Sequence, residues 1–477
     1  MELRKPKAGL LLIGAQRFTA IGEGSARGSY RQRKANEADW MAAEAGERFD
    51  VVFPGVIYGL EDINRAIDQY VFEKVDFVLA IYLSWSEDFT WARFLRDMPP
   101  VPILFAHRMR DSVTLGDTHD EDEFCEYLCC GGLVGALEAS GDNARWQRSL
   151  FETQIGTWDE VLVRAVQFGN AARARALLRQ SRAGLLASYN EVMWSTYVDP
   201  YLVFMKAGPE LGFYSVAELE DCVGEISPEL ARQTANRLSA AYPLNPDVDE
   251  EKFLASVRAT LGLELLAQKH RLDLLVLNDI DPILLTKIGL RPGFYPTNPD
   301  VSCVIVPEGD VGSGLAAYML RLLTGKTVHY IEPFHIDLPS DTFEGGHAGP
   351  NDYTHPDGRT RIARDVRFAK TNYKYAGAPF MWHVFPQGVQ TMVHVSQHGG
   401  GFILTAALVE SLPTEMHLAS YSHGRFRMIG QSCRDYFGKL LQTGVTQHFV
   451  LVEGDVMSEI LQLGRLLDFE THDLGRG

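Results

Sequence analysis

The sequence has no long apolar run, and this absence argues against a membrane-spanning protein. A transmembrane helix needs about 20 consecutive, predominantly apolar residues, and no run among the 477 residues reaches that length. The apolar stretch near the N-terminus, GLLLIGA, is too short to span a bilayer and is followed by no small-residue cleavage site. We therefore expect this stretch to be the first strand of the fold.

Basic residues and cysteines are also few. Lysine and arginine number 45 against 62 acidic residues, giving a formal charge of -17, which argues against a nucleic-acid partner because such domains are usually basic. The six cysteines form no CxxC pair. The segment CEYLCC could bind a metal, but Cys125 and Cys129 fit a buried helix face better. We expect reduced thiols, a cytoplasmic location and no nucleic-acid or membrane partner.

A chain of this length exceeds one hydrophobic core and indicates two or three domains. In residues 1–145, apolar strands alternate with amphipathic helices, which is typical of an open parallel α/β domain. The clearest helix has Ile63, Ala66, Ile67, Tyr70 and Val71 on one face. The strands expected in this domain are 7–15, 49–53, 75–85 and 101–107, and the helices are 35–47 and 61–74.

A second α/β domain is expected over 146–326, beginning with a helical stretch at 146–182. Its strongest strand, 272–282, has polar residues at its end, and we expect Asn278 and Asp279 to line a substrate pocket, because ligands bind beyond the carboxyl ends of such strands. In 327–477 the pattern changes to short β-forming segments separated by glycine and proline. The predicted fold class is two Rossmann- or flavodoxin-like parallel α/β domains followed by an antiparallel β-barrel-like domain.

One stretch carries most of the predicted chemistry. Val301–Val306 is predicted to be a buried strand, followed by Glu308, a glycine-rich turn and a helix that ends at Gly325. Glu332 follows the next strand, and His347 is expected in a glycine-flanked loop. Two carboxylates at neighbouring strand ends, with an imidazole nearby, suit a divalent metal. The alternative for Glu308 is a loop carboxylate that caps the next helix.

Histidines are concentrated in the last third of the chain, where 11 of the 14 lie beyond residue 325. Several of these are expected to be ordinary strand residues on half-exposed faces. His448, in TQHFVLVEGD, precedes a predicted strand of the last domain and completes a mixed oxygen and nitrogen donor set with the residues above. Such a set suits Mn²⁺, Co²⁺ or Fe²⁺.

At these positions the chain resembles the L-arabinose isomerase and L-fucose isomerase superfamily. The resemblance is carried by the Glu308-Gly309-Asp310 motif before a helix and by Glu332, His347 and His448 in that order. It implies that these two glutamates and two histidines bind the metal, Mn²⁺ with Co²⁺, Fe²⁺ or Mg²⁺ as alternatives. It also implies that Glu308 and Glu332 are the catalytic acid and base.

The resemblance further implies two substrate-binding residues and an assembly. Gln16, after the first strand, corresponds to a glutamine that reaches a neighbouring subunit's site, and Trp85 corresponds to an aromatic after a later strand. A homo-oligomer, trimeric or hexameric, is therefore expected. The implied activity is metal-dependent aldose–ketose isomerisation, through an ene-diol, of a small sugar, either an L-arabinose-like pentose or a related hexose or deoxy sugar.

Two other functions fit the residues. A metal-dependent sugar epimerase would use the same centre and would differ only in its product. A non-catalytic sugar-binding protein could be built on two α/β domains, but it would not need a carboxylate and imidazole set. The sequence leaves open which sugar is bound and whether that sugar is phosphorylated.

Overall fold

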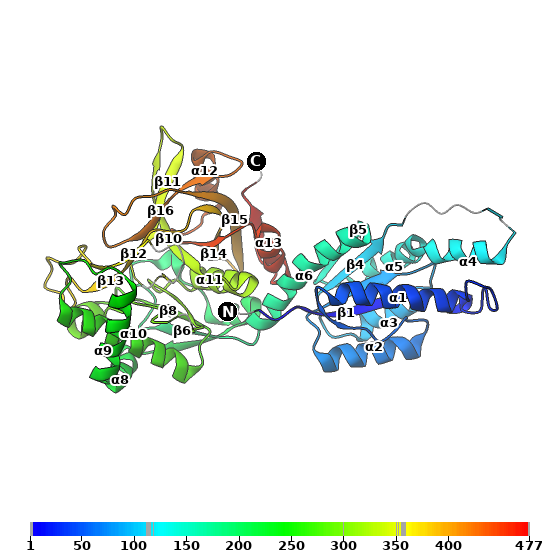
Figure 1. Cartoon of the computed structure of the whole chain (residues 1–477), viewed down its shortest axis with the longest axis horizontal. Helices are drawn as coiled ribbons and strands as arrows, with labels where there is room; N and C mark the ends of the chain where they lie inside the picture. The colour runs from blue at the N-terminus through cyan, green and yellow to red at the C-terminus, as the bar shows by residue number, and fades with distance from the viewer. Residues whose placement is uncertain are drawn as a thin grey trace. The chain divides into compact units, whose positions relative to one another are not determined.

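The computed structural model describes residues 3–110, 116–117, 119–298, 300–349, 351, 353 and 359–475. The chain forms two compact units, an N-terminal unit of Arg4–Ala176 and a C-terminal unit that consists mainly of Leu177–Gly477 (Figure 1). The predicted fold class is confirmed, because two parallel sheets precede an antiparallel β-barrel. The division into three domains stays a prediction. In these described ranges, no helix is both long enough and apolar enough to cross a membrane.

The N-terminal unit is built on a five-stranded parallel sheet of order β2-β1-β3-β4-β5. Its central strands, β1 and β3, are almost wholly buried, which explains their unbroken apolar sequences LLLI and FVLAIY. The strands are β1 (Lys7–Ile13), β2 (Asp50–Val52), β3 (Phe77–Tyr82), β4 (Ile103–Arg108) and β5 (Phe151–Gly156).

Helices cover both faces of this sheet. Ile63, Ala66, Ile67 and Tyr70 of α2 are buried in the core on one face, as the helical spacing predicts, whereas Val71 is 46% exposed and lies outside that face. The helices are α1 (Tyr30–Gly46), α2 (Leu60–Glu73), α3 (Phe89–Asp97), α4 (Glu121–Cys130), α5 (Gly132–Trp146) and α6 (Trp158–Leu178).

The expectation of a continuous helical stretch at 146–182 is wrong. Residues 151–156 form β5, which pairs in parallel with β4 from Ile103 to Arg108. The segment FETQIG is short and partly exposed, because it lies at the edge of the sheet and only one neighbouring strand covers it. An edge strand of this kind lacks the apolar run that marks a central strand.

The C-terminal unit contains a four-stranded parallel sheet of order β7-β6-β8-β9. The strands are β6 (Arg182–Leu186), β7 (Glu210–Tyr214), β8 (Leu274–Leu277) and β9 (Val304–Val306). The helices of eight residues or more that accompany it are α8 (Val216–Glu225), α9 (Pro228–Ala241), α10 (Glu250–His270) and α11 (Val311–Thr324).

Six antiparallel strands of the same unit close into a barrel in the order β14-β17-β10-β11-β16-β15, with β15 pairing back to β14. A seventh strand, β18 (Glu470–Asp473), pairs in parallel with β15, and β12 (Thr360–Arg364) pairs separately with β13 (Pro379–His383). The barrel strands are β10 (Val328–Asp337), β11 (Thr342–His347), β14 (Gly388–His398), β15 (Gly401–Leu412), β16 (Ser422–Met428) and β17 (Phe449–Glu453). The helices α12 (Cys433–Thr443) and α13 (Met457–Leu466) accompany the barrel.

Helix α11 joins the parallel sheet to the barrel, and Figure 1 shows it between them. Because it is covered on both sides, 12 of its 14 residues are buried, as expected of a helix that is apolar around its whole circumference. A Cβ added at Gly312 would lie 2.5 Å from the carbonyl oxygen of Val395 on β14, and one at Gly314 would lie 2.8 Å from Val276 on β8. The two glycines therefore allow close contact with both layers, and the N-terminus of α11 comes to the boundary where the candidate site lies.

Candidate metal centre

Glu308 lies just beyond β9 in a backbone conformation that is unusual for its residue type. Its φ is 63°, in the left-handed region that non-glycine residues rarely adopt, and Gly309 also has a positive φ of 72°. These two residues turn the chain from β9 into α11. The turn directs a largely buried carboxylate, whose side chain is 9% exposed, toward the barrel. Backbone strain of this kind is concentrated at functional sites.

The structure excludes the capping role considered for Glu308. The N-cap of α11 is Asp310, whose Oδ1 accepts a hydrogen bond from the backbone N–H of Ser313 at 3.0 Å. The Glu308 carboxylate therefore does not cap α11.

The barrel supplies the other three residues of the candidate centre. Glu332 lies on β10, His347 is the last residue of β11 and His448 immediately precedes β17. The expectation that His347 lies in a loop is wrong. Although Gly345 and Gly346 precede it, they are paired with β10 on one side and β16 on the other, so the strand continues through the glycines to His347.

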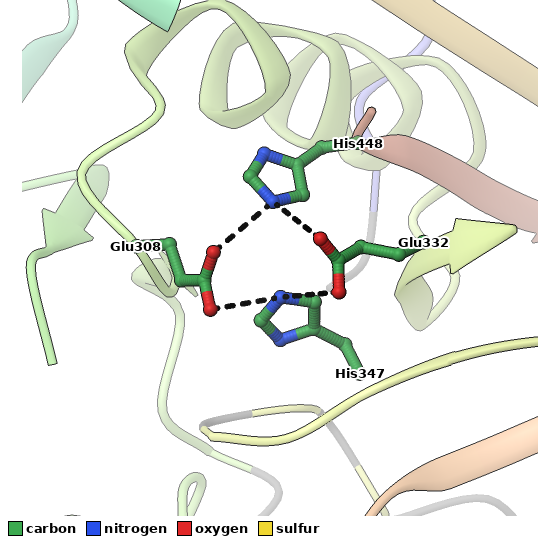
Figure 2. A group of neighbouring side chains, drawn as sticks. All are labelled: Glu308, Glu332, His347 and His448. Carbon is green, nitrogen blue, oxygen red and sulfur yellow. Dashed lines mark ion pairs between the residues drawn. The ribbon is translucent and has the colours of Figure 1, made fainter. Parts of the chain in front are cut away.

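These four side chains converge from separate elements, as Figure 2 shows. Each offers one ligand atom, and the four atoms lie within 4.8 Å of one another. The Nε2 atom of His448 is 3.3 Å from Oε2 of Glu308 and 3.6 Å from Oε1 of Glu332. The Nε2 atom of His347 is 3.6 Å from Oε1 of Glu308 and 3.9 Å from Oε2 of Glu332. Each imidazole therefore faces both carboxylates.

The donor atoms of this cluster fit a divalent cation. Nε2 of His347, Nε2 of His448 and Oε2 of Glu308 are buried and have no hydrogen-bond partner among the described residues. Buried polar atoms normally have a partner, and a metal ion at the centre of the four would provide one. Two carboxylates and two imidazoles form a mixed donor set of the kind that Mn²⁺, Fe²⁺ and Co²⁺ accept.

A second layer of contacts orients both imidazoles. Oδ2 of Asp310 lies 2.8 Å from Nδ1 of His448, and Nδ1 of His347 contacts the carbonyl oxygen of Ala348. Each histidine thus has its Nδ1 engaged and its Nε2 turned toward the centre, which is the arrangement of metal-binding histidines. From the sequence, Asp310 was expected only as the last residue of the Glu308-Gly309-Asp310 motif. The sequence did contain a signal for its capping role, because an aspartate at the start of a predicted helix, three residues before Ser313, is typical of an N-cap.

Tyr330 packs against both imidazoles, and His394 contacts the backbone of His448. The ring of Tyr330, on β10, lies 4.9 Å between centroids from each of His347 and His448. Nδ1 of the buried His394 lies 2.7 Å from the carbonyl oxygen of His448, and burial lowers the pKa of His394 to about 4. His394 is therefore neutral near pH 7 and can donate from Nδ1 to that carbonyl.

The charges in the cluster are strongly coupled. Burial raises the pKa of Glu308, but the contacts with His347 and His448 outweigh it and hold that pKa well below its usual range. Burial lowers the pKa of His448, but its contacts with Asp310 and Glu308 are stronger and raise it to about 9. Without a cation, the carboxylates thus attract a proton onto His448. A metal ion would supply positive charge in its place.

The two predicted pocket residues, Asn278 and Asp279, immediately follow β8, and Asp279 contacts the backbone of Glu308. Asp279 is 5% exposed, and its Oδ1 accepts a hydrogen bond from the backbone N–H of Glu308 at 3.1 Å. Asn278 is fully buried, and its Nδ2 lies 3.3 Å from the Oγ atom of Ser188. The structure shows Asp279 holding the unusual turn at Glu308, and the expectation that Asn278 and Asp279 contact substrate stays a prediction.

Gln16 and Trp85 belong to the N-terminal unit, where they follow β1 and β3. Trp85 is 43% exposed and packs edge-on against Phe18, with the guanidinium of Arg17 5.3 Å from its ring centroid. Gln16 is also exposed. Their side chains are thus available at the surface of that unit, and their role in substrate binding stays a prediction.

Comparison with known proteins relates part of the chain to a sugar isomerase. No family model matches. Sulfoquinovose isomerases of Priestia aryabhattai and Priestia megaterium are each 27% identical over 165 residues, which is 34% of this chain. The match covers 35% of each relative, so about a third of their length is aligned.

A solved structure, a periplasmic solute-binding protein of an ABC transporter from Actinobacillus succinogenes with bound D-allose, covers 58% of this chain and 80% of its own. Its identity is 14% and its TM-score 0.14. A likeness this low carries no argument.

Proposed function

We propose that this protein is a metal-dependent aldose–ketose isomerase that acts on a sugar through an ene-diol intermediate. The observation that carries the proposal is the convergence of Glu308, Glu332, His347 and His448 on one point, where both Nε2 atoms are buried and make no hydrogen bond within the described part of the chain. The sequence relationship to sulfoquinovose isomerases supports the same class of reaction.

The residues that would hold the cation are these four, and Mn²⁺ is the metal we propose first, with Co²⁺, Fe²⁺ and Mg²⁺ as alternatives. A divalent cation bound there would supply Lewis-acid polarisation of a substrate carbonyl. The two histidines would hold it through Nε2, because their Nδ1 atoms are already engaged. Asp310 would keep His448 in that orientation.

Glu308 and Glu332 are the groups that would move protons. In an aldose-to-ketose conversion, one carboxylate takes the proton from C2, the O2 hydroxyl proton passes to O1, and a proton is returned to C1, so that no atom is gained or lost. The Glu332 side chain is 28% exposed and the Glu308 side chain 9%. Glu332 is therefore the more accessible to a substrate entering from solvent. Because the two carboxylates share both histidines, we assign acid and base jointly to the pair.

We further propose that the chain is a divergent member of the L-arabinose and L-fucose isomerase superfamily, as the order of the four residues implies. On that proposal the enzyme is a cytoplasmic homo-oligomer, trimeric or hexameric. Gln16 and Trp85 of one subunit would then meet the substrate bound at the metal centre of its neighbour. The substrate class would extend from an L-arabinose-like pentose to hexoses and deoxy sugars, and the relatives add sulfoquinovose to it.

An assay of aldose-to-ketose conversion tests the proposal. The purified 477-residue chain would be supplied with Mn²⁺ or with a chelator and given pentoses, hexoses, deoxy sugars and sulfoquinovose. Conversion of any of these that requires the metal is the expected result. Epimer products without ketose would move the function to epimerisation. Sugar binding without any product would identify a sugar-binding protein and overturn the proposal.

A further inference from the structure

Two arginines and two aspartates lie beside the candidate metal centre and take no part in the chemistry above; three of them are buried, and the Arg367 side chain is 19% exposed. Arg291 is 3% exposed, and its Nη1 and Nη2 atoms lie 3.6 Å from Oδ2 of Asp279 and 3.1 Å from Oδ2 of Asp365. Arg367 follows Asp365 closely, and its Nη2 atom is 3.9 Å from the same oxygen. We call these four residues the arginine cluster.

The arginine cluster is connected to the metal centre through one carboxylate. Asp279 contacts Arg291 through Oδ2, and through Oδ1 it accepts the backbone N–H of Glu308. The guanidinium of Arg291 is therefore separated from the backbone of a candidate metal ligand by a single aspartate side chain. Asp279 therefore contacts both the turn that carries Glu308 and the nearer arginine of the cluster.

The arginines have more donors than the aspartates satisfy. Among the described residues, Nε of Arg291 and both Nε and Nη2 of Arg367 are buried and make no hydrogen bond. A guanidinium carries five N–H donors and no acceptor, and leaving such donors buried without a partner is costly. With two cations and two carboxylates the cluster has no formal net charge. It therefore offers a ligand directional donors rather than excess charge.

Aromatic rings hold these donors in place before any ligand arrives. The guanidinium carbon of Arg291 lies 5.7 Å from the ring centroid of Tyr375. That of Arg367 lies 4.4 Å from the Phe368 ring and 5.8 Å from the Tyr421 ring. An aromatic ring that stacks on a guanidinium covers its flat face. The N–H groups at the edge of the guanidinium stay available for hydrogen bonds to acceptors. A fixed, donor-only edge matches a group that has several acceptor oxygens and no hydrogen to donate.

We propose that Arg291 and Arg367 form a subsite for an anionic group, a sulfonate, carboxylate or phosphate, carried by the substrate at the end remote from the isomerising carbons. This inference rests on the proposed function, because the metal centre holds the other end of the same molecule. It narrows the substrate class from sugars in general to acidic sugars.

Matched substrates test the subsite directly. A hexose and the same hexose with a sulfonate, phosphate or carboxylate at C6 would be compared as substrates of the metal-loaded 477-residue chain. We expect at least one acidic sugar to exceed the neutral one in kcat/KM by about 100-fold, which corresponds to one or two hydrogen bonds between charged groups. The acidic sugar with the highest value would identify the anion. Equal kcat/KM across the series would overturn the subsite and leave the isomerase in place.

Variants of Arg367 separate recognition from folding. Arg367→Met keeps the length of the side chain over Phe368 and removes all its donors. It should lower kcat/KM for the acidic sugar roughly 100-fold while the neutral sugar stays within about threefold. For the acidic sugar, kcat/KM of Arg367→Lys should lie between the values of the wild type and Arg367→Met, because lysine restores the charge without the planar guanidinium. Arg232→Met, at an exposed arginine on α9, is the matched control and should change neither value.

A binding measurement keeps the subsite testable if no sugar is turned over. That result would remove the isomerase proposal, and calorimetric titration of the metal-loaded wild type and Arg367→Met with the same four sugars would then decide the subsite alone. Tighter binding of an acidic sugar that is lost in Arg367→Met, with an unchanged thermal midpoint, would support it. Binding that is absent, or equal in the two proteins, would overturn it.

Discussion

Both units of this protein place polar residues beyond the carboxyl ends of a parallel sheet, but the two places differ in burial. In the N-terminal unit, Gln16 is exposed and Trp85 is 43% exposed. In the C-terminal unit, Asn278 is 0%, Asp279 5% and Glu308 7% exposed. The same architecture has produced an open surface in one unit and a closed centre in the other.

The difference lies in what covers the strand ends. The described strands of the N-terminal unit all belong to one parallel sheet. These strands therefore form no second sheet that could cover Gln16 or Trp85. In the C-terminal unit, the barrel brings Glu332, His347 and His448 against Glu308. A parallel α/β sheet provides the crevice, and here three of the four candidate ligands come from the second layer.

The largest expected effect is at Glu308. On the proposed mechanism, Glu308→Gln removes a carboxylate that transfers protons but keeps its shape, and it should lower kcat by about 10³-fold, in the range of general acid–base catalysis. Metal content measured by mass spectrometry should stay near the wild-type value because three ligands remain. Glu410→Gln, on the exposed side of β15, is the control and should leave kcat unchanged. Full activity in Glu308→Gln would remove this residue from the chemistry.

Asp310→Asn tests whether the second layer of contacts defines the closed centre. The amide can still accept from Ser313, but it no longer places a negative charge 2.8 Å from Nδ1 of His448. Metal affinity should fall roughly 10–100-fold, as for other residues that orient metal ligands, and competition with a fluorescent chelator measures this. Asp435→Asn in the first turn of α12 is the matched control. Equal affinity in both variants would show that His448 does not need Asp310.

Gly312→Ala tests the contact between α11 and the barrel on which the closed centre depends. The new methyl group would meet the carbonyl oxygen of Val395, a backbone atom, at 2.5 Å, so the helix or β14 must move. Overpacking of this kind costs about 1–3 kcal/mol of unfolding free energy, measured by denaturant titration. Gly438→Ala in α12, where no atom lies within 4 Å of an added Cβ, should instead be neutral or stabilising by up to about 1 kcal/mol. If both variants have the same stability, the close approach at Gly312 is not needed.

The smallest effect is expected in the open crevice. Gln16→Ala should change the unfolding free energy by less than about 0.5 kcal/mol, because surface substitutions usually do. If the N-terminal unit contributes to the substrate site, kcat/KM should nevertheless fall about tenfold, as for the loss of one hydrogen bond. Gln69→Ala is the matched control, because Gln69 is also an exposed glutamine of the same unit, on α2, and its kcat/KM should not change. Identical kinetics in the two variants would confine the substrate site to the C-terminal unit.

Much of the fold could be predicted because a parallel strand that is buried on both faces has a continuous apolar sequence. The runs LLLI, FVLAIY and LLVL are central strands, and the helical spacing of α2 identifies its buried face apart from Val71. The edge strand β5 has no such sequence, since a strand with one neighbour and partial exposure has no need of an apolar run. His347 was placed in a loop because glycines usually signal turns, whereas here they lie inside a paired strand.

What the sequence by itself determined is the chemistry of the donors and the local shape around Glu308. Residue types set the metal preference, and the Glu-Gly-Asp turn before an apolar helix follows from local backbone rules. Only the tertiary structure decided which side chains meet. Because β17 pairs with β10 and α11 packs against both strands, His448 lies 3.3 Å from Glu308, 140 positions earlier in the chain. The arginine cluster has the same origin, because Arg291 and Arg367 become neighbours only through Asp365. Contacts so distant along the chain leave no periodic pattern; the resemblance alone grouped the four candidate metal ligands, and no feature of the sequence indicated the arginine cluster.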